Sequence, residues 1–395
     1  MILSETAPSP AQARAAARAT YIAFIGSGFA FASWAARIPQ VRDRLHLQPS
    51  ELGLVLLAIA AGSVIALPLS GPVLTRLGSR RTVAVMSVVL AAGLVAAALG
   101  YLYGVLPVVA GLFLVGLGNG AWDVAMNVQG ARVEQHLGRS IMSRFHAGFS
   151  LGTVAGALIG ALMVALHVPV TAHLLGVAVV VAVVVPVAVR RFVPDHDGNA
   201  DDEAGPAGSW TAWTEPRTLL IGLFVLAFAF AEGTGNDWIS VALIDDHHAP
   251  ATVGTLGFAV FLAAMTIGRW VGPGLLDRYG RVAVIRALSI LAVLGLVLFV
   301  FGPSTPVAFA GAVMWGGGTS LGFPVGMSAA ADDPARAASR VSVVASIGYC
   351  AFLGGPPLIG FLGQQFTVLR ALTVVAALLA LAALITGSVR PLDRS

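Results

Sequence analysis

Long apolar stretches recur from one end of the chain to the other, and short polar segments separate them. Each stretch is roughly 20 residues long and apolar on all sides, as a helix must be to cross the hydrocarbon core of a bilayer. A membrane β-barrel requires alternating apolar and polar residues instead. The pattern therefore predicts an all-α membrane protein with about twelve transmembrane helices. Their expected ranges are 18–38, 51–73, 81–103, 106–129, 144–166, 170–190, 218–241, 253–275, 282–302, 307–330, 341–363 and 367–388.

The composition agrees with this pattern and adds an orientation. Of the 395 residues, 57% are hydrophobic and only 11% are charged, whereas soluble domains contain about 25% charged residues. All 23 basic residues are arginine, and short loops rich in basic residues face the cytoplasm. Most of these arginines precede the first span or follow the even-numbered spans, so both termini are predicted to be cytoplasmic. The net charge of +4 follows from these loops, and no nucleic-acid partner is expected.

Signatures of catalysis and of metal binding are missing from the sequence. Cys350 is the only cysteine, which excludes an intrachain disulfide and a cysteine cluster for a metal. There is no His-Glu-x-x-His motif, no Gly-x-Ser-x-Gly elbow and no P-loop. We therefore expect neither an enzyme nor a bound metal or cofactor.

The chain divides into two related halves. Residues 191–217 are polar and rich in proline, glycine and acidic residues, which predicts a cytoplasmic linker. It separates two six-helix bundles, 18–190 and 218–388, with cytoplasmic tails at 1–17 and 389–395. Residues 29–32 (Phe-Ala-Phe-Ala) recur as residues 228–231, and other short motifs recur at offsets close to 200. Such parallel repeats are typical of one large class of transporters, whose substrate site lies near the membrane midplane.

The loops after the second and eighth spans carry a family resemblance. They resemble the signature of the major facilitator superfamily, Gly-x-x-x-Asp-Arg-x-Gly-Arg-Arg. The second copy is nearly complete, although Pro273 holds the leading glycine position. In the first copy Thr75 replaces the aspartate, which weakens the cytoplasmic charge interaction that this aspartate provides in the family. The resemblance implies a cytoplasmic gate formed by Gly71, Arg76, Gly78, Arg80, Asp277, Arg278, Gly280 and Arg281.

The resemblance extends over essentially the whole chain. Within the superfamily the chain is similar to the fucose:proton symporter-like branch, and most closely to YbjJ-type transporters of the bacterial inner membrane. The segments that carry this similarity are residues 33–39, 123–134, 146–157, 230–238 and 339–360. The resemblance implies the fold of the superfamily, with two pseudo-symmetric bundles, in the bacterial inner (plasma) membrane. We expect a monomer in the lipid bilayer that binds a small-molecule substrate and protons.

Asp123 is an ionisable residue in the middle of the apolar stretch 106–129. An aspartate at the centre of a membrane helix costs roughly 2.5–3.5 kcal/mol to insert, so such residues usually have a function. Asn127 follows at a spacing of four, which places both side chains on one helical face. The resemblance implies that Asp123 accepts the coupled proton, although its relatives carry a longer glutamate there. A buried acid with a purely structural role is the alternative. His146 is a candidate for exchanging a proton with Asp123, and a structural hydrogen bond is its alternative.

The seventh span holds a second group of polar residues, Glu232, Asn236 and Asp237. Glu232 and Asn236 share a helical face. The repeat places Arg37 and Asp237 at equivalent heights near the periplasmic ends of paired helices. We therefore predict a periplasmic gate formed by an ion pair between Arg37 and Asp237, with two separate interfacial charges as the alternative.

Tryptophans occur on the spans that line the central cavity in the superfamily. Trp34, Trp122, Trp238 and Trp315 lie on spans 1, 4, 7 and 10. Trp34 and Trp238 are close to helix ends, where interfacial aromatic residues are common. Aromatic faces beside carboxylates and amides suit a polyol, a sugar or a cation. The expected substrate cavity contains Trp34, Trp122, Asn127, Glu232, Asn236 and Trp315.

These features together predict a proton-coupled secondary active transporter of a small polar solute, sugar-like compounds included, that works by alternating access. Symport is favoured because the Gly-Pro signature of drug antiporters is absent from the fifth span. Two alternatives stay open. One is proton-driven efflux of small organic compounds, and the other is a non-transporting receptor or assembly partner built on the same fold.

Overall fold

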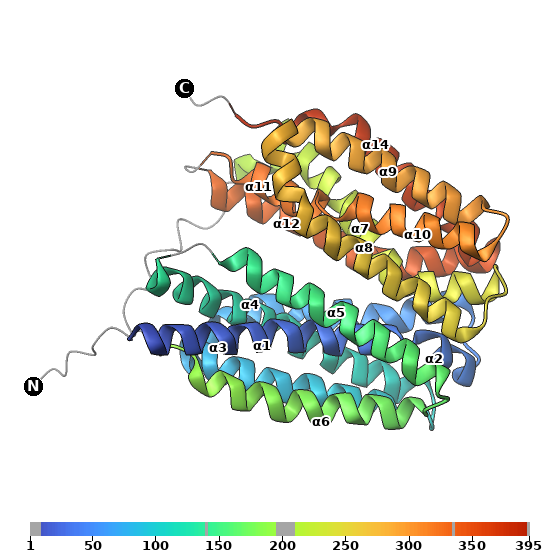
Figure 1. Ribbon diagram of the computed structural model, residues 1–395, viewed down its shortest axis with the longest axis horizontal. Coiled ribbons are helices and arrows are strands. Elements are labelled where there is room, and N and C mark those ends of the chain that lie inside the picture. Colours follow the sequence, from blue (N-terminus) through green and yellow to red (C-terminus); the bar gives the residue numbers. More distant parts are fainter. Residues whose placement is uncertain (1–8, 139–140, 195–209, 334–335, 393–395) are drawn as a thin grey trace, which may run out of the picture. The chain divides into compact units, whose positions relative to one another are not determined.

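The structure, a computed structural model, describes residues 9–138, 141–194, 210–333 and 336–392. These residues are almost entirely helical and contain no strand (Figure 1). The α-helices are α1 (Pro10–Ala35), α2 (Ile38–Leu45), α3 (Pro49–Gly100), α4 (Val105–Leu137), α5 (Met142–Ala165), α6 (Val170–Ala188), α7 (Pro216–Asp245), α8 (Ala251–Tyr279), α9 (Arg281–Phe301), α10 (Thr305–Thr319), α11 (Gly322–Ala330), α12 (Ala337–Gln365), α13 (Val368–Ala371) and α14 (Thr373–Leu384). Three short 3-10 helices are η1 (Val189–Arg191), η2 (Trp210–Thr214) and η3 (Thr386–Val389).

The expected membrane spans are all found as helices. In the described part of the chain, nine helices are long and apolar enough to cross a membrane. One of them, α3, contains the expected span 51–73 and all but the last three residues of the expected span 81–103, with a break in the helical backbone at Gly78. The tenth span is divided into α10 and α11, and the twelfth into α13 and α14. The prediction of an all-α membrane protein with about twelve spans is confirmed.

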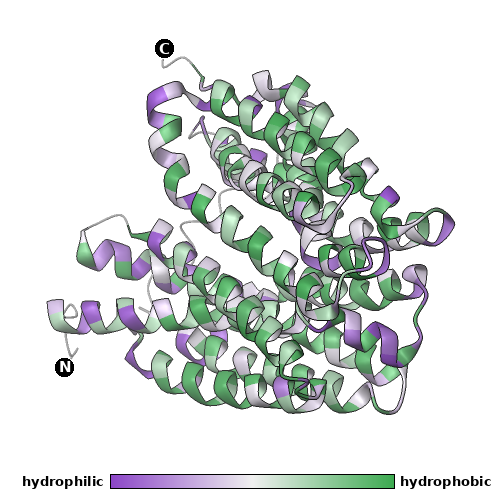
Figure 2. Ribbon diagram, turned by 45° about the vertical axis from the view of Figure 1, so that its right-hand side comes forward, coloured by the Kyte–Doolittle hydropathy of each residue, from purple (hydrophilic) through white to green (hydrophobic). Residues whose placement is uncertain are grey.

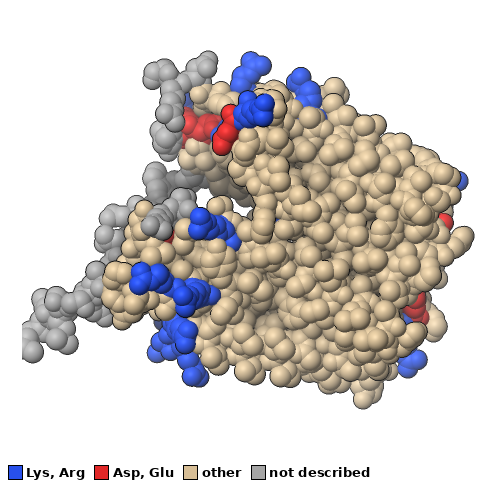
Figure 3. Space-filling view, in the orientation of Figure 1, with Lys and Arg blue, Asp and Glu red and all other residues tan. Residues whose placement is uncertain are grey.

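Polar residues are concentrated at the ends of these helices. Figure 2 shows hydrophobic residues along the helices and hydrophilic residues at their ends and in the connections. In the view of Figure 3, the charged side chains lie at the helix ends and the surface between them is uncharged. An uncharged belt with charged margins is what a helix bundle needs when its middle faces hydrocarbon.

The chain forms two compact units. Unit 1 consists of Met1–Trp34, Ala58–Gly156 and Pro169–Ala200, and unit 2 of Ala35–Leu57, Ala157–Val168 and Asp201–Ser395. Unit 2 therefore includes α2 and the beginning of α3 as well as the second half of the chain. Residues 195–209 of the predicted linker lie outside the described residues, and η2 forms a short helix near its end. The proposed domain limits themselves stay a prediction.

The same close helix contacts occur inside each unit, at positions that differ by the offset seen in the sequence. A Cβ atom at Gly116 of α4 would lie 2.0 Å from the carbonyl oxygen of Ile59 in α3. At the equivalent position of unit 2, a Cβ atom at Gly316 of α10 would lie 2.3 Å from the carbonyl oxygen of Phe261 in α8. The two contacts are the same contact in two copies, which supports the predicted duplication.

A second pair of glycine contacts follows the same rule. A Cβ atom at Gly111 of α4 would meet the carbonyl oxygen of Gly93 at 2.7 Å. A Cβ atom at Gly311 of α10 would meet that of Gly295 in α9 at 2.6 Å. In both units, glycine on both helices allows the two backbones to approach closely, as in many membrane helix pairs.

Adjacent glycines in α10 allow this packing to be tested. We expect Gly316→Ala to lower the stability of the protein by about 2 kcal/mol, because its new methyl group overlaps the backbone of α8. Gly317→Ala is the matched control, since a Cβ atom there would meet no atom within 4 Å apart from its chain neighbours and the nearby backbone of its own helix. The measurement is the apparent melting temperature of the purified variants in detergent. Equal melting temperatures for the two variants would contradict the predicted contact.

The loop glycines of the two copies of the signature motif, Gly78 and Gly280, have the same backbone conformation. Gly78 has φ 73° and ψ 165°, and Gly280 has φ 78° and ψ 158°. Residues with a side chain avoid this region of backbone conformation, which is essentially restricted to glycine. Each glycine turns the chain from one span into the next, within α3 in unit 1 and between α8 and α9 in unit 2.

Candidate functional site

In unit 1, the polar residues of the expected site lie along one face of α4. Asp123 and Asn127 are partly exposed, whereas Trp122 and Met126 beside them are buried. The amide nitrogen Nδ2 of Asn127 donates to the backbone carbonyl of Asp123 at 2.8 Å and to its carboxylate Oδ1 at 3.3 Å. No basic side chain in the described part of the chain pairs with Asp123.

The carboxyl group of Asp123 can be either charged or protonated in this position. An uncompensated charge in a membrane helix is costly, and binding a proton removes that cost. The amide donor of Asn127 favours the charged form, since a hydrogen bond to a charged group contributes about 1.5–3 kcal/mol, but it brings no counter-charge. The arrangement is therefore chemically suited to reversible proton binding.

The polar face of α4 extends one turn further than the sequence suggested. Asn119 precedes Asp123 by four residues, and its Oδ1 accepts a hydrogen bond of 2.8 Å from the hydroxyl of Ser27 in α1. Asn119, Asp123 and Asn127 thus form one row at a spacing of four. We had not singled out Asn119 or Ser27, although the regular spacing was visible in the sequence.

His146 lies in α5, and its side chain is exposed. Its ring lies edge-on to that of Phe24 in α1, with 5.1 Å between the ring centroids. The contacts of Asp123 described above do not include His146, and the proton exchange between the two residues stays a prediction.

In unit 2, Glu232 of α7 forms an ion pair inside the expected membrane region. Nitrogen Nη2 of Arg269 in α8 donates to both carboxylate oxygens of Glu232, at 2.9 Å and 2.8 Å. The two side chains are 28% and 23% exposed, for Arg269 and Glu232 respectively. Sequence reasoning missed Arg269, although an arginine within the span 253–275 is as costly there as Asp123 is in its own span.

The ion pair is anchored to a break in the tenth span. Ser320 lies between α10 and α11, and its carbonyl oxygen accepts a hydrogen bond of 3.3 Å from Nε of Arg269. Four residues later, Pro324 has no N–H to donate to that carbonyl. The proline frees the Ser320 carbonyl, and Arg269 satisfies it.

Arg37 of the predicted periplasmic gate contacts a backbone carbonyl in this structure. Nη2 of Arg37 donates to the carbonyl oxygen of Val168 at 3.0 Å, and no ion pair to Asp237 occurs among the described residues. Instead, Arg42 of α2 pairs with Asp245 at the end of α7, with Nη2 2.8 Å from Oδ1. The pair between Arg37 and Asp237 stays a prediction.

The four tryptophans of the expected cavity helices are buried. Trp34 is 2% exposed, and Trp122, Trp238 and Trp315 are 0% exposed. Trp315 packs edge-on against Phe261 of α8, with ring centroids 5.2 Å apart. In this structure the tryptophans therefore contribute to helix packing, and their contact with a solute stays a prediction.

The signature motif of unit 2 leads into a network of charges at the helix ends. Arg281 of the motif pairs with Asp332 at 2.8 Å, and Arg217 at the start of α7 pairs with the other oxygen of Asp332 at 3.0 Å. Asp277 of the motif is exposed and forms no ion pair within the described ranges, and Arg278 stacks over the ring of Tyr279. In unit 1, Gly71, Arg76 and Arg80 are exposed. Their role as a gate stays a prediction.

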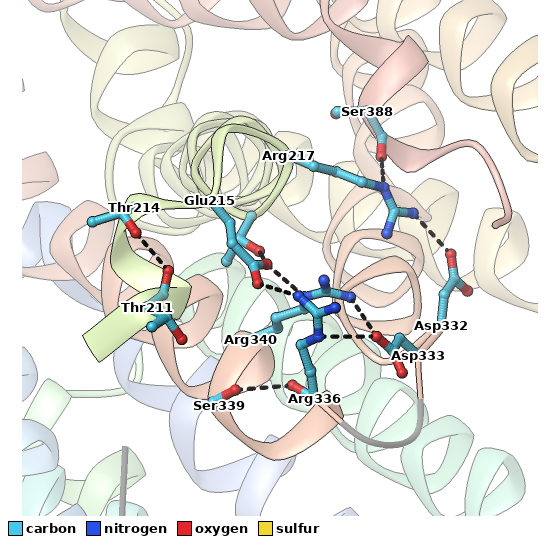
Figure 4. Close-up of polar contacts among 11 residues, drawn as sticks. Thr211, Thr214, Glu215, Arg217, Asp332, Asp333, Arg336, Ser339, Arg340 and Ser388 are labelled. Atoms are coloured by element: carbon cyan, nitrogen blue, oxygen red, sulfur yellow. Dashed lines mark hydrogen bonds and ion pairs between the residues drawn. The ribbon is translucent and has the colours of Figure 1, made fainter. Parts of the chain in front are cut away.

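Figure 4 shows the neighbouring part of this network, centred on Glu215. Its carboxylate accepts hydrogen bonds from Nε of Arg340 at 2.6 Å and from Nη1 of Arg336 at 3.1 Å. Asp333 pairs with the same two arginines, at 3.5 Å to Arg336 and 3.3 Å to Arg340. The network joins the start of α7 to the start of α12.

The Glu215 network should persist across the physiological pH range. The hydrogen bond from Arg340 lowers the pKa of Glu215 to about 2, against a smaller opposing effect of burial. A depressed pKa gives stability that is present above the unfolded pKa of about 4.3 and is lost as the pH falls towards the folded value. We therefore expect Glu215→Gln to lower the apparent melting temperature equally at about pH 5.5 and about pH 8. If Glu215→Gln and wild type differed in melting temperature at one of these pH values but not at the other, this assignment would be contradicted.

Comparison with known proteins gives a consistent result. A sequence model described as Major Facilitator Superfamily matches residues 20–351 and 228–395. The uncharacterized transporter y4wD of Sinorhizobium fredii (strain NBRC 101917 / NGR234) is 32% identical over 368 residues, which are 92% of this chain and 95% of that protein. An uncharacterized MFS-type transporter of Yersinia pestis is 31% identical over 363 residues, 91% of this chain and 92% of that protein.

Among solved structures, a mutant of the nucleoside transporter NupG is similar, with a TM-score of 0.77. The match covers 94% of this chain and 99% of that chain at 14% sequence identity. At this identity the structural similarity shows the fold alone.

Proposed function

The chain belongs to the major facilitator superfamily, and on this premise we propose that it is a proton-coupled secondary active transporter that takes up a small polar solute by symport. Sugar-like solutes are the favoured class, and nucleosides, which carry a sugar, belong to the panel to be tested. The protein works by alternating access in the bacterial inner membrane, with both termini in the cytoplasm.

One observation carries the proton coupling. Asp123 is a carboxylate within the span formed by α4, and its polar contact there is a neutral amide, that of Asn127. Acids within membrane helices commonly pair with a basic side chain, and Glu232 pairs in this way with Arg269. Asp123 differs from Glu232 in this respect, which supports a role in which its charge changes during the cycle.

The proposal is tested with wild-type protein in proteoliposomes. Candidate solutes are first selected by thermal-shift screening against sugars, sugar acids, nucleosides, amino acids and organic cations. We expect a selected solute to accumulate when the external medium is more acidic than the lumen, and a protonophore to abolish the accumulation. Accumulation driven by the opposite gradient would indicate antiport, and binding without any flux would indicate a receptor. Either result would overturn the proposal.

A further inference from the structure

The guanidinium group of Arg269 is only partly used by the protein. Arginine has five N–H donors. Nε donates to the Ser320 carbonyl, and Nη2 donates to both oxygens of Glu232. Nη1 has no acceptor among the described residues, and the side chain is 28% exposed. Two strong donors are therefore available on a charged group within a membrane span.

Arg269 Nη1 is not among the buried polar atoms of the described residues that lack a partner, so its donors are accessible to water or to a ligand. A buried ion pair that only holds two helices together is often replaced by apolar residues without loss of stability. An arginine at the centre of a membrane helix costs roughly 2.5–3.5 kcal/mol to insert. A hydroxyl or carbonyl ligand could be bound by an amide side chain without that cost. The use of arginine is explained if the ligand itself carries a negative charge.

The neighbouring turn of α7 offers a second, complementary group. Asn236 follows Glu232 by four residues and so shares its helical face. Its Oδ1 is buried and has no hydrogen-bond partner in the described part of the chain. An unpaired acceptor one helical turn from the carboxylate that pairs with Arg269 suits a ligand with both an anionic group and a hydroxyl or amino group.

We propose that Arg269 is a subsite for the carboxylate of the transported solute, that Glu232 occupies this subsite when the solute is absent, and that the solute is a hydroxylated acid such as a sugar acid. The planar guanidinium binds carboxylates through two parallel hydrogen bonds, which lysine cannot reproduce. The solute carboxylate competes with Glu232 for Arg269, and Asn236 accepts a hydrogen bond from a neighbouring hydroxyl.

The inference rests on the proposed proton symport for its charge balance. A carboxylate added to the neutral pair of Arg269 and Glu232 brings one negative charge into the membrane region. A proton that enters with the solute offsets that charge, so the loaded protein gains no net charge. A solute anion and a proton are thus a consistent pair of substrates for this chain.

The test compares acids with neutral partners of the same shape. Purified protein in detergent, without any gradient, is titrated with glucuronate against glucose and with galacturonate against galactose. The wild-type protein is expected to bind the acid of at least one pair more tightly than its neutral partner by about tenfold or more, equivalent to ~1.4 kcal/mol. Equal binding within both pairs, or no binding of either acid, would overturn the inference.

Variants assign the preference to Arg269. The double variant Glu232→Gln/Arg269→Gln removes both charges without leaving one unpaired, and it is expected to bind acid and neutral partner equally. Glu232→Gln alone removes the competing carboxylate and is expected to bind the acid more tightly than wild type. Arg370→Gln is the matched control, because it removes an exposed arginine of unit 2 that lies in α13, outside the site and the gate, and it is expected to keep the wild-type preference. A double variant that keeps the preference would overturn the inference.

The outcome is separable from that of the proposed function. Binding in detergent needs no proton gradient, so a carboxylate preference can be present even if uptake proves independent of protons. Conversely, gradient-driven uptake of neutral sugars with no preference for acids would retain the proposed function and refute this subsite.

Discussion

Asp123→Asn is expected to abolish uphill accumulation of the solute and to leave solute exchange across the membrane intact. A gradient of about two pH units supplies ~2.7 kcal/mol per proton, which supports about 100-fold accumulation of a neutral solute that enters with one proton. Asparagine keeps the size and polarity of the side chain but cannot bind and release a proton. Accumulation by the variant should therefore fall to simple equilibration.

Two variants serve as controls for this prediction. Asp123→Glu restores the carboxylate at a slightly longer reach and is expected to retain accumulation. Glu51→Gln removes a carboxylate that is exposed in the first turn of α3 and belongs to neither the site nor the gate, and it is expected to behave as wild type. Accumulation and counterflow are measured in the same proteoliposome preparations. Wild-type accumulation by Asp123→Asn would remove this residue from the coupling mechanism.

Asp332→Ala is expected to cause the largest loss of stability among the charged residues at the helix ends. The Asp332 side chain is 11% exposed and forms ion pairs with both Arg217 and Arg281. Arg217 also donates to the Ser388 carbonyl, so the same cluster holds the end of the chain at η3 (Figure 4). Removal of the carboxylate leaves two partly buried guanidinium groups without a counter-charge. We expect a loss of about 2 kcal/mol, between the values typical of exposed and of buried ion pairs.

The matched control for Asp332 is Asp277→Ala. Both residues are aspartates of unit 2 at helix ends, but Asp277 is exposed and forms no ion pair within the described residues. Its removal is expected to leave the apparent melting temperature unchanged. Equal losses for the two variants would show that the network contributes no more than an isolated surface charge.

The features that could be predicted from the sequence are those determined by residues close together in the chain or by a repeated segment. The helical spans follow from apolar length alone, and the proximity of Asp123 and Asn127 follows from a spacing of four. The duplication was visible as short motifs at offsets near 200, and the structure shows it as equivalent contacts of Gly116 and Gly316. In each case the relevant information lies within one helix or one repeated segment.

The features that sequence reasoning missed depend on contacts between distant segments. The ion pair between Glu232 and Arg269 joins α7 to α8, and no spacing rule relates the two positions. Most arginines of the chain lie in loops or at span ends, and the residues next to Arg269 in the sequence do not indicate its partner. A contact between the tryptophans and a solute stays a prediction, because an aromatic residue in a span also packs well against other helices, as Trp315 does against Phe261.

The central claim is that proton and solute move together through Asp123. The most direct test records the external pH of weakly buffered proteoliposomes while solute flows inward down its own gradient, with no pH gradient imposed. We predict that wild-type protein makes the external medium more alkaline as solute enters, and that Asp123→Asn lets solute equilibrate with no change in pH. Solute entry through the wild-type protein without alkalinisation, or proton movement that persists in Asp123→Asn, would contradict the account.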